Sequence, residues 1–468
     1  VSSPLTLWDR YGSFNLGGTE MPPFGLTNLA AMLIRHGFDV EIIDGEALRL
    51  TCEEIAELIL EKAPLFVGFT SVTLSIHKTA KIAALVKSKN RDIKTIVGGP
   101  HLTAAPEKTF EMFPHLDIGV IGEGDITIVE LAENINSEDK LLKVKGLLLR
   151  NDNKLYFTEP RPLIENLDSL PLPAWNLLPK ITEYYMPSLN SYNRSPVGFL
   201  VTTRGCYAKC NYCSRAVYQN TVRQFSAEYI VKMIEDLQNN YHIKEIVFED
   251  DEFLAERNRI IRLHELFKKK KINLSWSCLT RINRADPEIL RIMKDMGCWQ
   301  IAYGIESGNQ KVLNFLKKGT NIEKIEETIK WTKKAGILPK GFFMLGHPVD
   351  SRDTIRDTIN FAKRLDLRDF QISIFTPLPG SEIYKDAHKY GWFDDNWEKM
   401  NYWNILFVPN GLSAEELRAF QKRAFKEFYF RPKIIISYIF RLRSKDQLLK
   451  LLRAFFALLK FLIFEKRK

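Results

Sequence analysis

Apolar strand-like runs and amphipathic helical stretches alternate along residues 24–135. The expected helices are Phe24–His36, Glu53–Glu61, His77–Lys89 and Ile126–Asn134, and the expected strands are Asp39–Ile43, Leu65–Thr70, Thr95–Gly98 and Ile118–Ile121. Short apolar strands separated by helices of this length are typical of βαβ units. They predict a parallel, doubly wound sheet of the Rossmann type, with its ligand beyond the carboxyl ends of the strands.

A second alternation begins near Gly198. Six strand-like segments are expected at Phe199–Thr203, Glu245–Phe248, Leu274–Cys278, Gln300–Ile305, Lys340–Leu345 and Gln371–Phe375. Helical patterns separate them at Ala227–Asn239, Arg257–Lys270, Pro287–Met296, Ile322–Ala335 and Thr354–Leu365. Six βα units predict a partial (β/α)6 parallel barrel, with chemistry at the carboxyl ends of its strands.

These patterns divide the chain into four parts. We expect a Rossmann-like domain at 1–138, whose first strand is weak or truncated, a linker at 139–194, the barrel at 195–392, and a C-terminal region at 393–468. The prolines of Leu170-Pro-Leu-Pro-Ala-Trp175 break a helical hydrogen-bond ladder, so the linker is expected to be extended there. The fold class is therefore α/β, with a helical C-terminal tail.

Composition narrows the class of protein. With 45% hydrophobic and 26% charged residues in 468, the chain has the balance of a globular protein, which excludes a disordered, collagen-like or polytopic membrane protein. Six cysteines are too few for a disulfide scaffold, and three lie within eight residues. That crowding indicates a metal and a reducing compartment, and the absence of a signal-peptide pattern favours the cytoplasm.

The crowded cysteines form the segment Arg204-Gly-Cys206-Tyr-Ala-Lys-Cys210-Asn-Tyr-Cys213, just after the first barrel strand. Three thiolates on one loop suit an iron–sulfur cluster, and a four-iron cluster would keep one iron open to another ligand. A zinc site would need a fourth ligand nearby, and the next histidine, His242, lies beyond a predicted helix. Three unrelated buried thiols are the other alternative. The remaining cysteines, Cys52, Cys278 and Cys298, are expected to be small buried hydrophobic residues.

The C-x3-C-x2-C spacing on the first loop of a six-unit barrel resembles the radical S-adenosylmethionine superfamily. Further motifs follow in the same order at strand ends: Glu249-Asp250-Asp251, Gly304-Ile-Glu306-Ser-Gly308, Gly346-His-Pro348 and Pro377-Leu-Pro-Gly380. The resemblance covers about Ser195 to Tyr390. It implies that Cys206, Cys210 and Cys213 hold a 4Fe–4S cluster that cleaves S-adenosylmethionine to a 5′-deoxyadenosyl radical. It also implies a flavodoxin- or ferredoxin-type one-electron reductase as a partner.

By the same resemblance, Tyr212 lies beside the adenine of the nucleotide ligand, and Glu249 and Asp250 bind its amino group. Glu306 lies near the ribose and methionine. Ser277 and Arg281 also face the ligand. The domain ahead of the barrel resembles the cobalamin-binding domain of one large subclass. There the cobalamin tail would be lined by Ser71, Thr73, Gly98, Gly99, Gly122, Glu123 and Gly124. Glycines and small side chains at strand ends let a ligand approach the backbone closely.

No histidine in residues 1–135 has the D-x-H-x-x-G pattern that usually supplies a cobalt ligand. Asp386-Ala-His388-Lys-Tyr-Gly391 matches literally, but it follows the sixth barrel strand, so we reject it. His101 is an outside candidate. The absence of the motif is typical of the radical subclass that the domain resembles. A domain that binds no corrinoid is the alternative that the weak or missing opening strand leaves open.

The resemblance predicts a cobalamin-dependent radical S-adenosylmethionine enzyme that transfers a methyl group to an unactivated carbon. The alternative is an oxidative, ring-forming reaction of the magnesium-protoporphyrin monomethyl ester cyclase type, and a remote one is a non-enzymatic corrinoid or redox sensor. A tRNA methylthiotransferase would need three further cysteines in the first domain, which has only Cys52. The substrate, small or lipid-like, is not specified by any motif.

The positive charge lies in the tail. Of the net charge of +10, the segment from Arg431 to Lys468 carries +9, with eleven Lys/Arg and two acids. Residues 448–464 predict an amphipathic helix in which Lys450, Arg453, Ala457 and Lys460 share one face. Three charges argue against a membrane-spanning helix. A helix lying on an anionic membrane is expected, with packing on the barrel as the alternative, and no nucleic-acid contact is expected.

Overall fold

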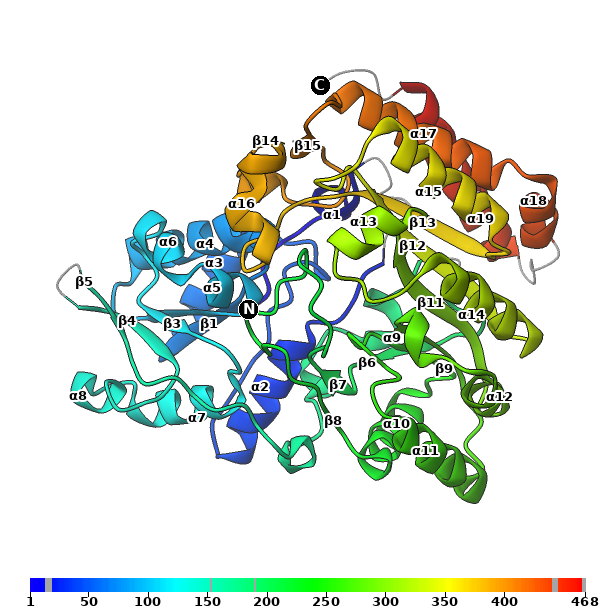
Figure 1. The fold of residues 1–468 in the computed structure, drawn as a ribbon. Coiled ribbons are helices and arrows are strands. Elements are labelled where there is room, and N and C mark those ends of the chain that lie inside the picture. The colour runs from blue at the N-terminus through cyan, green and yellow to red at the C-terminus, as the bar shows by residue number, and fades with distance from the viewer. Residues whose placement is uncertain (13–18, 152–153, 189–190, 440–444, 465–468) are drawn as a thin grey trace.

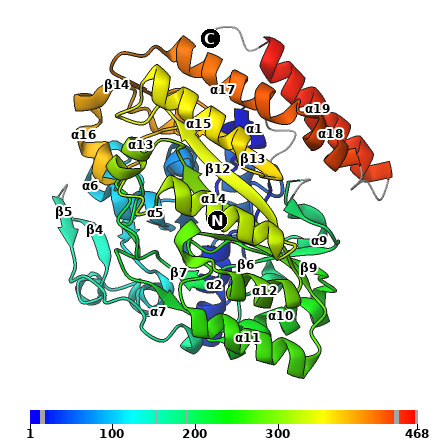
Figure 2. The same ribbon diagram turned by 45° about the vertical axis from the view of Figure 1, so that its right-hand side comes forward.

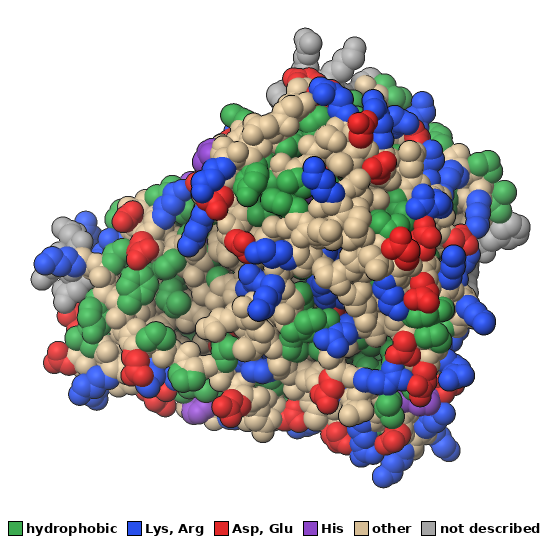
Figure 3. Space-filling view, in the orientation of Figure 1, with side chains coloured by type: hydrophobic (Ala, Val, Ile, Leu, Met, Phe, Trp, Pro, Cys, Tyr) green, Lys and Arg blue, Asp and Glu red, His purple; other side chains and the backbone are tan. Residues whose placement is uncertain are grey.

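The computed structural model of the protein describes residues 1–12, 19–151, 154–188, 191–439 and 445–464. Two β-sheets organise it: the first lies on the left of Figure 1, and the second runs from the lower centre to the upper right. Lys, Arg, Asp and Glu side chains are interspersed over the face shown in Figure 3, in keeping with a nearly neutral body. Among the described helices, none has the length and apolar character needed to cross a membrane.

The first sheet confirms the doubly wound prediction. Its order is β1 (Phe66–Thr70), β2 (Lys94–Gly98), β3 (Ile118–Val120), β4 (Leu147–Asn151) and β5 (Lys154–Phe157), with the first three parallel and the last two antiparallel. The helices around it are α2 (Phe24–Arg35), α3 (Cys52–Lys62), α4 (Ile76–Lys89), α5 (Pro100–Ala104), α6 (Pro106–Met112), α7 (Asp125–Asn134) and α8 (Glu138–Leu141). Residues 147–157, which we assigned to a linker, therefore extend this sheet.

The start of the chain lies beside β1. Ser2 bridges Thr70 on one side and Asp44 on the other, and its N–H donates to the Ile43 carbonyl at 3.0 Å. The strand predicted at Asp39–Ile43 is wrong: among the described residues, the pairing nearest to it is the isolated bridge between Asp44 and Ser2. The expected weak first strand is thus reduced to a bridge at Ser2.

The second sheet is the predicted partial barrel. Its parallel strands lie in chain order: β6 (Val197–Leu200), β9 (Glu245–Phe248), β10 (Ser275–Thr280), β11 (Cys298–Glu306), β12 (Leu338–Leu345) and β13 (Asp369–Ile374). The helices between them are α10 (Ala227–Tyr241), α11 (Arg257–Lys270), α12 (Pro287–Asp295), α13 (Gln310–Phe315), α14 (Ile322–Lys334) and α15 (Arg352–Arg364). α11 buries Ile260, Leu263 and Phe267, a helical spacing that turns one face to the sheet. Thr203, predicted in the first strand, instead begins a short strand, β7 (Thr203–Arg204), which pairs with β8 (Arg223–Gln224).

The two sheets share their hydrophobic cores. Met32 of α2 and Ile128 of α7 belong to the same buried cluster as Phe199 of β6. A second cluster joins Val97 of β2 to Trp397, beyond α16 (Glu382–Tyr390) and β14 (Gly391–Phe393). The segment after the barrel therefore returns to the first domain, as the orange elements of Figure 1 show.

Helix α17 (Ala414–Tyr429) lies along the outer edge of β13. Tyr429 Oη donates to the Phe370 carbonyl at 2.6 Å, and Gln421 Nε2 donates to the Ile372 carbonyl at 3.1 Å. The Ile374 N–H donates to the Tyr402 carbonyl at 2.9 Å. Polar groups of the C-terminal region thus satisfy this strand edge where a further strand would otherwise pair.

The last two helices are α18 (Pro432–Ile439) and α19 (Lys445–Phe464), which lie together at the upper right of Figure 2. Ala457 and Phe461 of α19 are buried, and the Phe461 ring lies 5.8 Å from that of Phe425 on α17. The predicted polar face is wrong at Ala457, because that residue is buried, one helical turn before Phe461. The alternative from the sequence, packing of this helix on the protein's own body, is present.

Candidate active site

The three clustered cysteines lie on one loop, residues 205–222, whose two ends are held together by β7 and β8. Gly205 has a φ of +88°, and a Cβ there would lie 2.2 Å from the Thr221 carbonyl oxygen. Only glycine therefore allows the loop to close. Cys213 is exposed, Cys206 is partly exposed and Cys210 is buried.

Two cationic side chains lie beside these thiols. Arg281 Nη1 donates to Cys210 Sγ at 3.3 Å. A hydrogen bond with Cys213 lowers the pKa of Cys210 to about 5, with Lys318 and Arg281 contributing, and raises the pKa of Cys213 well above its usual value. Burial raises the pKa of Cys206. Because thiolate is the form that binds iron, these interactions favour the ligating state of Cys210.

The loop fits a 4Fe–4S cluster in its donor set. Three soft sulfur ligands on one segment suit iron, and each can bind a separate iron of a cluster. Within the part of the chain that the structure describes, no three His, Cys, Asp or Glu side chains are grouped to hold one metal ion.

Glu306 and Tyr212, both predicted to contact the nucleotide, are brought together by Lys318. Glu306 ends β11 with a φ of +70°, next to a register shift in the pairing with β12. Its carboxylate is buried and lies 2.8 Å from Lys318 Nζ, which also donates to Tyr212 Oη at 3.2 Å. Sequence reasoning missed Lys318, because a lysine in the Lys317-Lys318-Gly319 turn carries no motif.

Glu249 and Asp250 follow β9 but have different surroundings. Burial raises the pKa of Glu249 to about 6, partly offset by Lys340. The Asp250 carboxylate accepts hydrogen bonds from the N–H and hydroxyl groups of Thr202 and Thr203, at 2.5–3.0 Å. Asp250 thus ties β9 to the segment that enters the cysteine loop, and its contact with the nucleotide stays a prediction. Ser277 is buried on β10, paired with Val247 of β9.

The carboxyl ends of β1 and β2 meet closely. The Ser71 N–H and hydroxyl both donate to the Gly98 carbonyl, at 2.9 and 3.2 Å. Gly99 has a φ of +100°, and a Cβ there would lie 2.8 Å from the Ser71 carbonyl oxygen. This edge suits a ligand that approaches the backbone, as the predicted cobalamin tail would.

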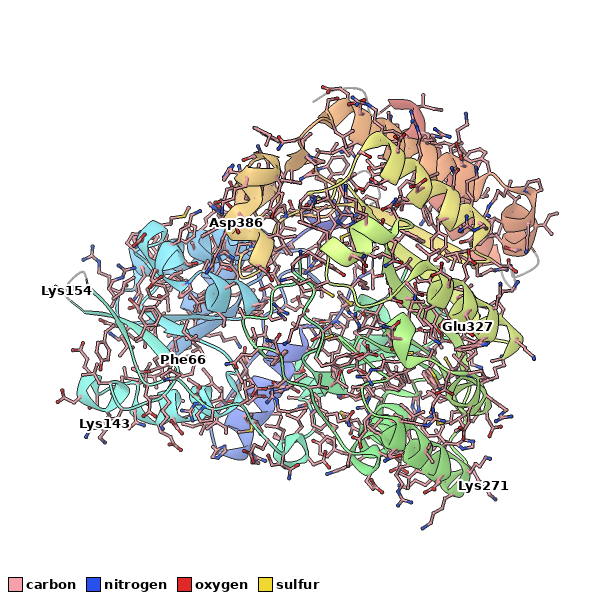
Figure 4. The ribbon with its side chains drawn as sticks, viewed as in Figure 1. Phe66, Lys143, Lys154, Lys271, Glu327 and Asp386 are labelled. Atoms are coloured by element: carbon pink, nitrogen blue, oxygen red, sulfur yellow. The ribbon has the colours of Figure 1, made fainter. Side chains whose placement is uncertain are left out.

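His101 lies behind that edge and is fully buried. Its two ring nitrogens each lie 3.1 Å from a threonine hydroxyl, Nδ1 from Thr73 and Nε2 from Thr109, and burial lowers its pKa to about 4. Both nitrogens are therefore occupied within the domain, including the contact with Thr73, a predicted cobalamin-tail residue. The rejected motif that contains Asp386 lies on α16 at the outer surface (Figure 4).

The three residues predicted to line the cobalamin tail after β3 have different surroundings. Gly122 has a φ of +79° and open space where a Cβ would lie, and its N–H donates to Thr103 Oγ1 at 3.1 Å. At Gly124 a Cβ would lie 3.2 Å from Leu29 Cδ2. Glu123 instead points away from the small-residue edge to Arg204 and Arg223, which flank the cysteine loop.

Sequence models of two known families match the chain. That of the radical SAM superfamily matches residues 200–362, and that of the B12 binding domain matches residues 16–132. An uncharacterized methyltransferase of Pyrococcus horikoshii is 33% identical over 425 residues, covering 90% of this chain and 91% of that protein. The anaerobic magnesium-protoporphyrin IX monomethyl ester cyclase of Rubrivivax gelatinosus is 26% identical, covering 89% of this chain and 78% of that protein.

Solved structures share the fold over most of the chain. The cobalamin-dependent S-adenosylmethionine radical enzyme OxsB, with aqua-cobalamin and S-adenosylmethionine bound, superposes with a TM-score of 0.73 at 18% identity, covering 92% of this chain and 68% of that one. The radical S-adenosylmethionine methyltransferase TsrM of Kitasatospora setae gives 0.67 at 19% identity, covering 90% and 82%. The chain belongs to the radical SAM superfamily, in the family that carries a B12-binding domain, and its cofactors are a 4Fe–4S cluster, S-adenosylmethionine and cobalamin.

Proposed function

We propose that the protein transfers a methyl group from S-adenosylmethionine to an unactivated carbon of a small or lipid-like substrate. The observation that carries this proposal is the cysteine loop, which is tied directly to the turn after β3 in the B12-binding domain. When bound, the cluster supplies the electron that cleaves S-adenosylmethionine, and cobalamin supplies a carrier for the methyl group.

The proposed reaction balances as follows. One substrate C–H bond, two S-adenosylmethionine molecules and two electrons give the methylated product, S-adenosylhomocysteine, 5′-deoxyadenosine and methionine. The substrate hydrogen leaves with 5′-deoxyadenosine, and a one-electron reductase of the flavodoxin or ferredoxin class supplies the electrons.

The chain's own residues orient the nucleotide in this proposal. Glu249 presents a carboxylate that can pair with its ammonium group, and Glu306 presents one that can accept hydrogen bonds from the ribose hydroxyls. Lys318 and Arg281 place positive charge beside the cluster thiolates and can hold the nucleotide carboxylate. Glu249, Arg281 and Glu306 lie at or just after strand ends, as is usual for chemistry in such barrels, whereas Lys318 follows α13 in the connection from β11 to α14.

The test is product analysis of the anaerobic holoenzyme loaded with hydroxocobalamin. With S-adenosylmethionine and a reductant, the proposal expects both S-adenosylhomocysteine and 5′-deoxyadenosine. Formation of 5′-deoxyadenosine alone would overturn methyl transfer and favour the ring-forming alternative, to which the cyclase relative's coverage of this chain lends support. Formation of neither product would favour a sensor.

We also propose that α18 and α19 rest on an anionic membrane surface. Apolar side chains stay exposed on both helices: Ile435, Ile436, Leu448, Leu449, Leu452, Phe455, Phe456 and Ile463. Exposed Arg453 and Lys460 lie on the same helix as most of them, while Phe461 anchors that helix to α17. Exposed apolar residues interleaved with cations fit the interface of an anionic bilayer.

Vesicle flotation tests this surface. The full chain is expected to float with phosphatidylglycerol-containing vesicles and less with pure phosphatidylcholine, and the double variant Leu452→Glu, Phe456→Glu should stay at the bottom. Leu65→Glu, an exposed leucine of the first domain, is the control. Flotation of the double variant at the wild-type level would contradict the proposal, as would a wild-type protein that only self-associates through this face.

A further inference from the structure

A buried group of four charged side chains joins the two domains at the base of the cysteine loop. Arg204 Nη1 lies 2.9 Å from Glu123 Oε1 and 2.8 Å from Asp125 Oδ2, and its Nη2 lies 3.0 Å from Asp125 Oδ1. Arg223 Nη1 lies 2.6 Å from Glu123 Oε2. We call Glu123, Asp125, Arg204 and Arg223 the interdomain clamp.

The clamp is almost inaccessible to solvent, and its positive and negative charges are equal in number. Its side chains are between 3% and 11% exposed, with two carboxylates against two guanidinium groups. Asp125 binds Arg204 with both oxygens, which fixes direction as well as distance. Glu123 Oε2 also accepts the Ile164 N–H at 2.8 Å. Loss of one partner would leave a buried charge unpaired, so the arrangement is held firmly.

The two arginines hold both ends of the cysteine loop. Arg204 lies two residues before Cys206. Arg223 lies opposite Arg204 in the β7–β8 pair. One carboxylate, that of Glu123, therefore contacts the chain as it enters the loop and as it leaves. Gly205, where a Cβ would lie 2.2 Å from the Thr221 carbonyl oxygen, is the one residue between Arg204 and the first cysteine.

The two acids belong to the turn Gly122–Asp125, at the carboxyl end of β3. The flanking glycines of this turn were predicted to line the cobalamin tail. The turn thus combines Gly122, which has open space beside it, with the two acids that bind Arg204 at the base of the cysteine loop.

We infer that Glu123 and Asp125 are positioning residues that hold the cysteine loop at one fixed place relative to the B12-binding domain, and thereby set the separation of the cluster and cobalamin. The inference rests on the proposed function only for the use of that separation in methyl transfer. The separation itself is a property of the holoenzyme and can be measured without a substrate.

The test is the magnetic interaction between cob(II)alamin and the reduced cluster, measured by pulsed electron paramagnetic resonance on the holoenzyme. Wild type should give one narrow distance distribution. Asp125→Asn keeps the side-chain shape but loses the charge, and should broaden that distribution about twofold at unchanged iron and cobalt content. Glu159→Gln, which removes an exposed ion pair with Lys145 in the same domain, is the matched control.

A second variant covers loss of folding. Arg204→Lys keeps the charge but cannot bind Asp125 with two parallel hydrogen bonds, and it should also broaden the distribution. A wild-type distribution in either folded variant would overturn the inference. The proposed function fails separately: a wild-type holoenzyme with a narrow distribution that forms no S-adenosylhomocysteine would refute methyl transfer and leave the clamp standing.

Discussion

The carboxyl ends of the two sheets are built from different chemistry. The barrel end is charged and buried, with Glu306 paired to Lys318 and Arg281 bonded to Cys210. The end of the first sheet is made of backbone and small neutral groups, such as Ser71 and Gly99. Fixed charges suit a site at which charge changes during the reaction. Small neutral groups instead leave space for a ligand to approach the backbone.

This contrast predicts different responses to mutation. Substitutions at the barrel end should change chemistry and electrostatic stability, and substitutions at the first sheet should change the space for a ligand.

Cys210→Ala should reduce 5′-deoxyadenosine formation to background, because a cluster ligand beside Arg281 is lost. Iron content after anaerobic reconstitution and a product assay measure the effect. Cys278→Ala, a buried cysteine of β10 outside the loop, is the control and should keep its cluster. Wild-type cleavage by Cys210→Ala would refute the cluster assignment.

Lys318→Met should lower the free energy of unfolding by about 3–5 kcal/mol, because it leaves the Glu306 carboxylate buried without its partner. Urea denaturation of the apoprotein measures the loss. The neighbouring Lys317 forms an exposed pair with Glu382, so Lys317→Met should cost about 1 kcal/mol or less. Equal losses in the two variants would show that burial of the first pair has no energetic effect.

Gly99→Ala should cost about 1–3 kcal/mol, because its backbone (φ +100°, ψ −177°) lies in a region that is essentially restricted to glycine. The added Cβ would also meet the Ser71 carbonyl and displace this strand end, which should weaken cobalamin binding. Absorbance titration with hydroxocobalamin measures the affinity. S-adenosylmethionine cleavage should be nearly unchanged. Gly68→Ala, in β1, is the matched control, because an added Cβ there would lie in open space. A similar loss of cobalamin affinity in that variant would show that the effect does not come from the close contact at Gly99.

Glu249 should make nucleotide binding depend on pH. Burial raises the pKa of Glu249 from 4.5 to about 6, so the folded state favours the protonated acid. The free energy of unfolding should therefore fall by roughly 1–2 kcal/mol as pH rises through that window. The ionised form attracts an ammonium group, so affinity for S-adenosylmethionine should fall below pH 6. Isothermal calorimetry across pH 5–8 tests this, and Glu249→Gln should flatten the dependence; an unchanged slope in that variant would assign it to another group.

The sequence predicted both sheets because their periodic patterns are local, and it predicted the three cysteines because their spacing is itself the signal. It could not predict the partners that complete the site. Lys318, Asp125 and Arg223 have no motif. Each becomes significant through a contact with a residue far along the chain: Tyr212 for Lys318, Arg204 for Asp125 and Glu123 for Arg223. Glu123 shows the limit best, since its glycine-rich turn indicated a ligand edge while its carboxylate contacts Arg204, 81 residues away.

The polar groups that cover the outer edge of β13 bear on how the protein avoids aggregation. An open barrel ends in strands with unpaired backbone groups, which are templates for pairing with another chain. Here Tyr429, Gln421 and the Tyr402 carbonyl occupy three successive outward positions of that edge. Removing α17, which carries Tyr429 and Gln421, would expose the unpaired edge of β13. The helix therefore protects the barrel from intermolecular β-pairing as well as supporting it.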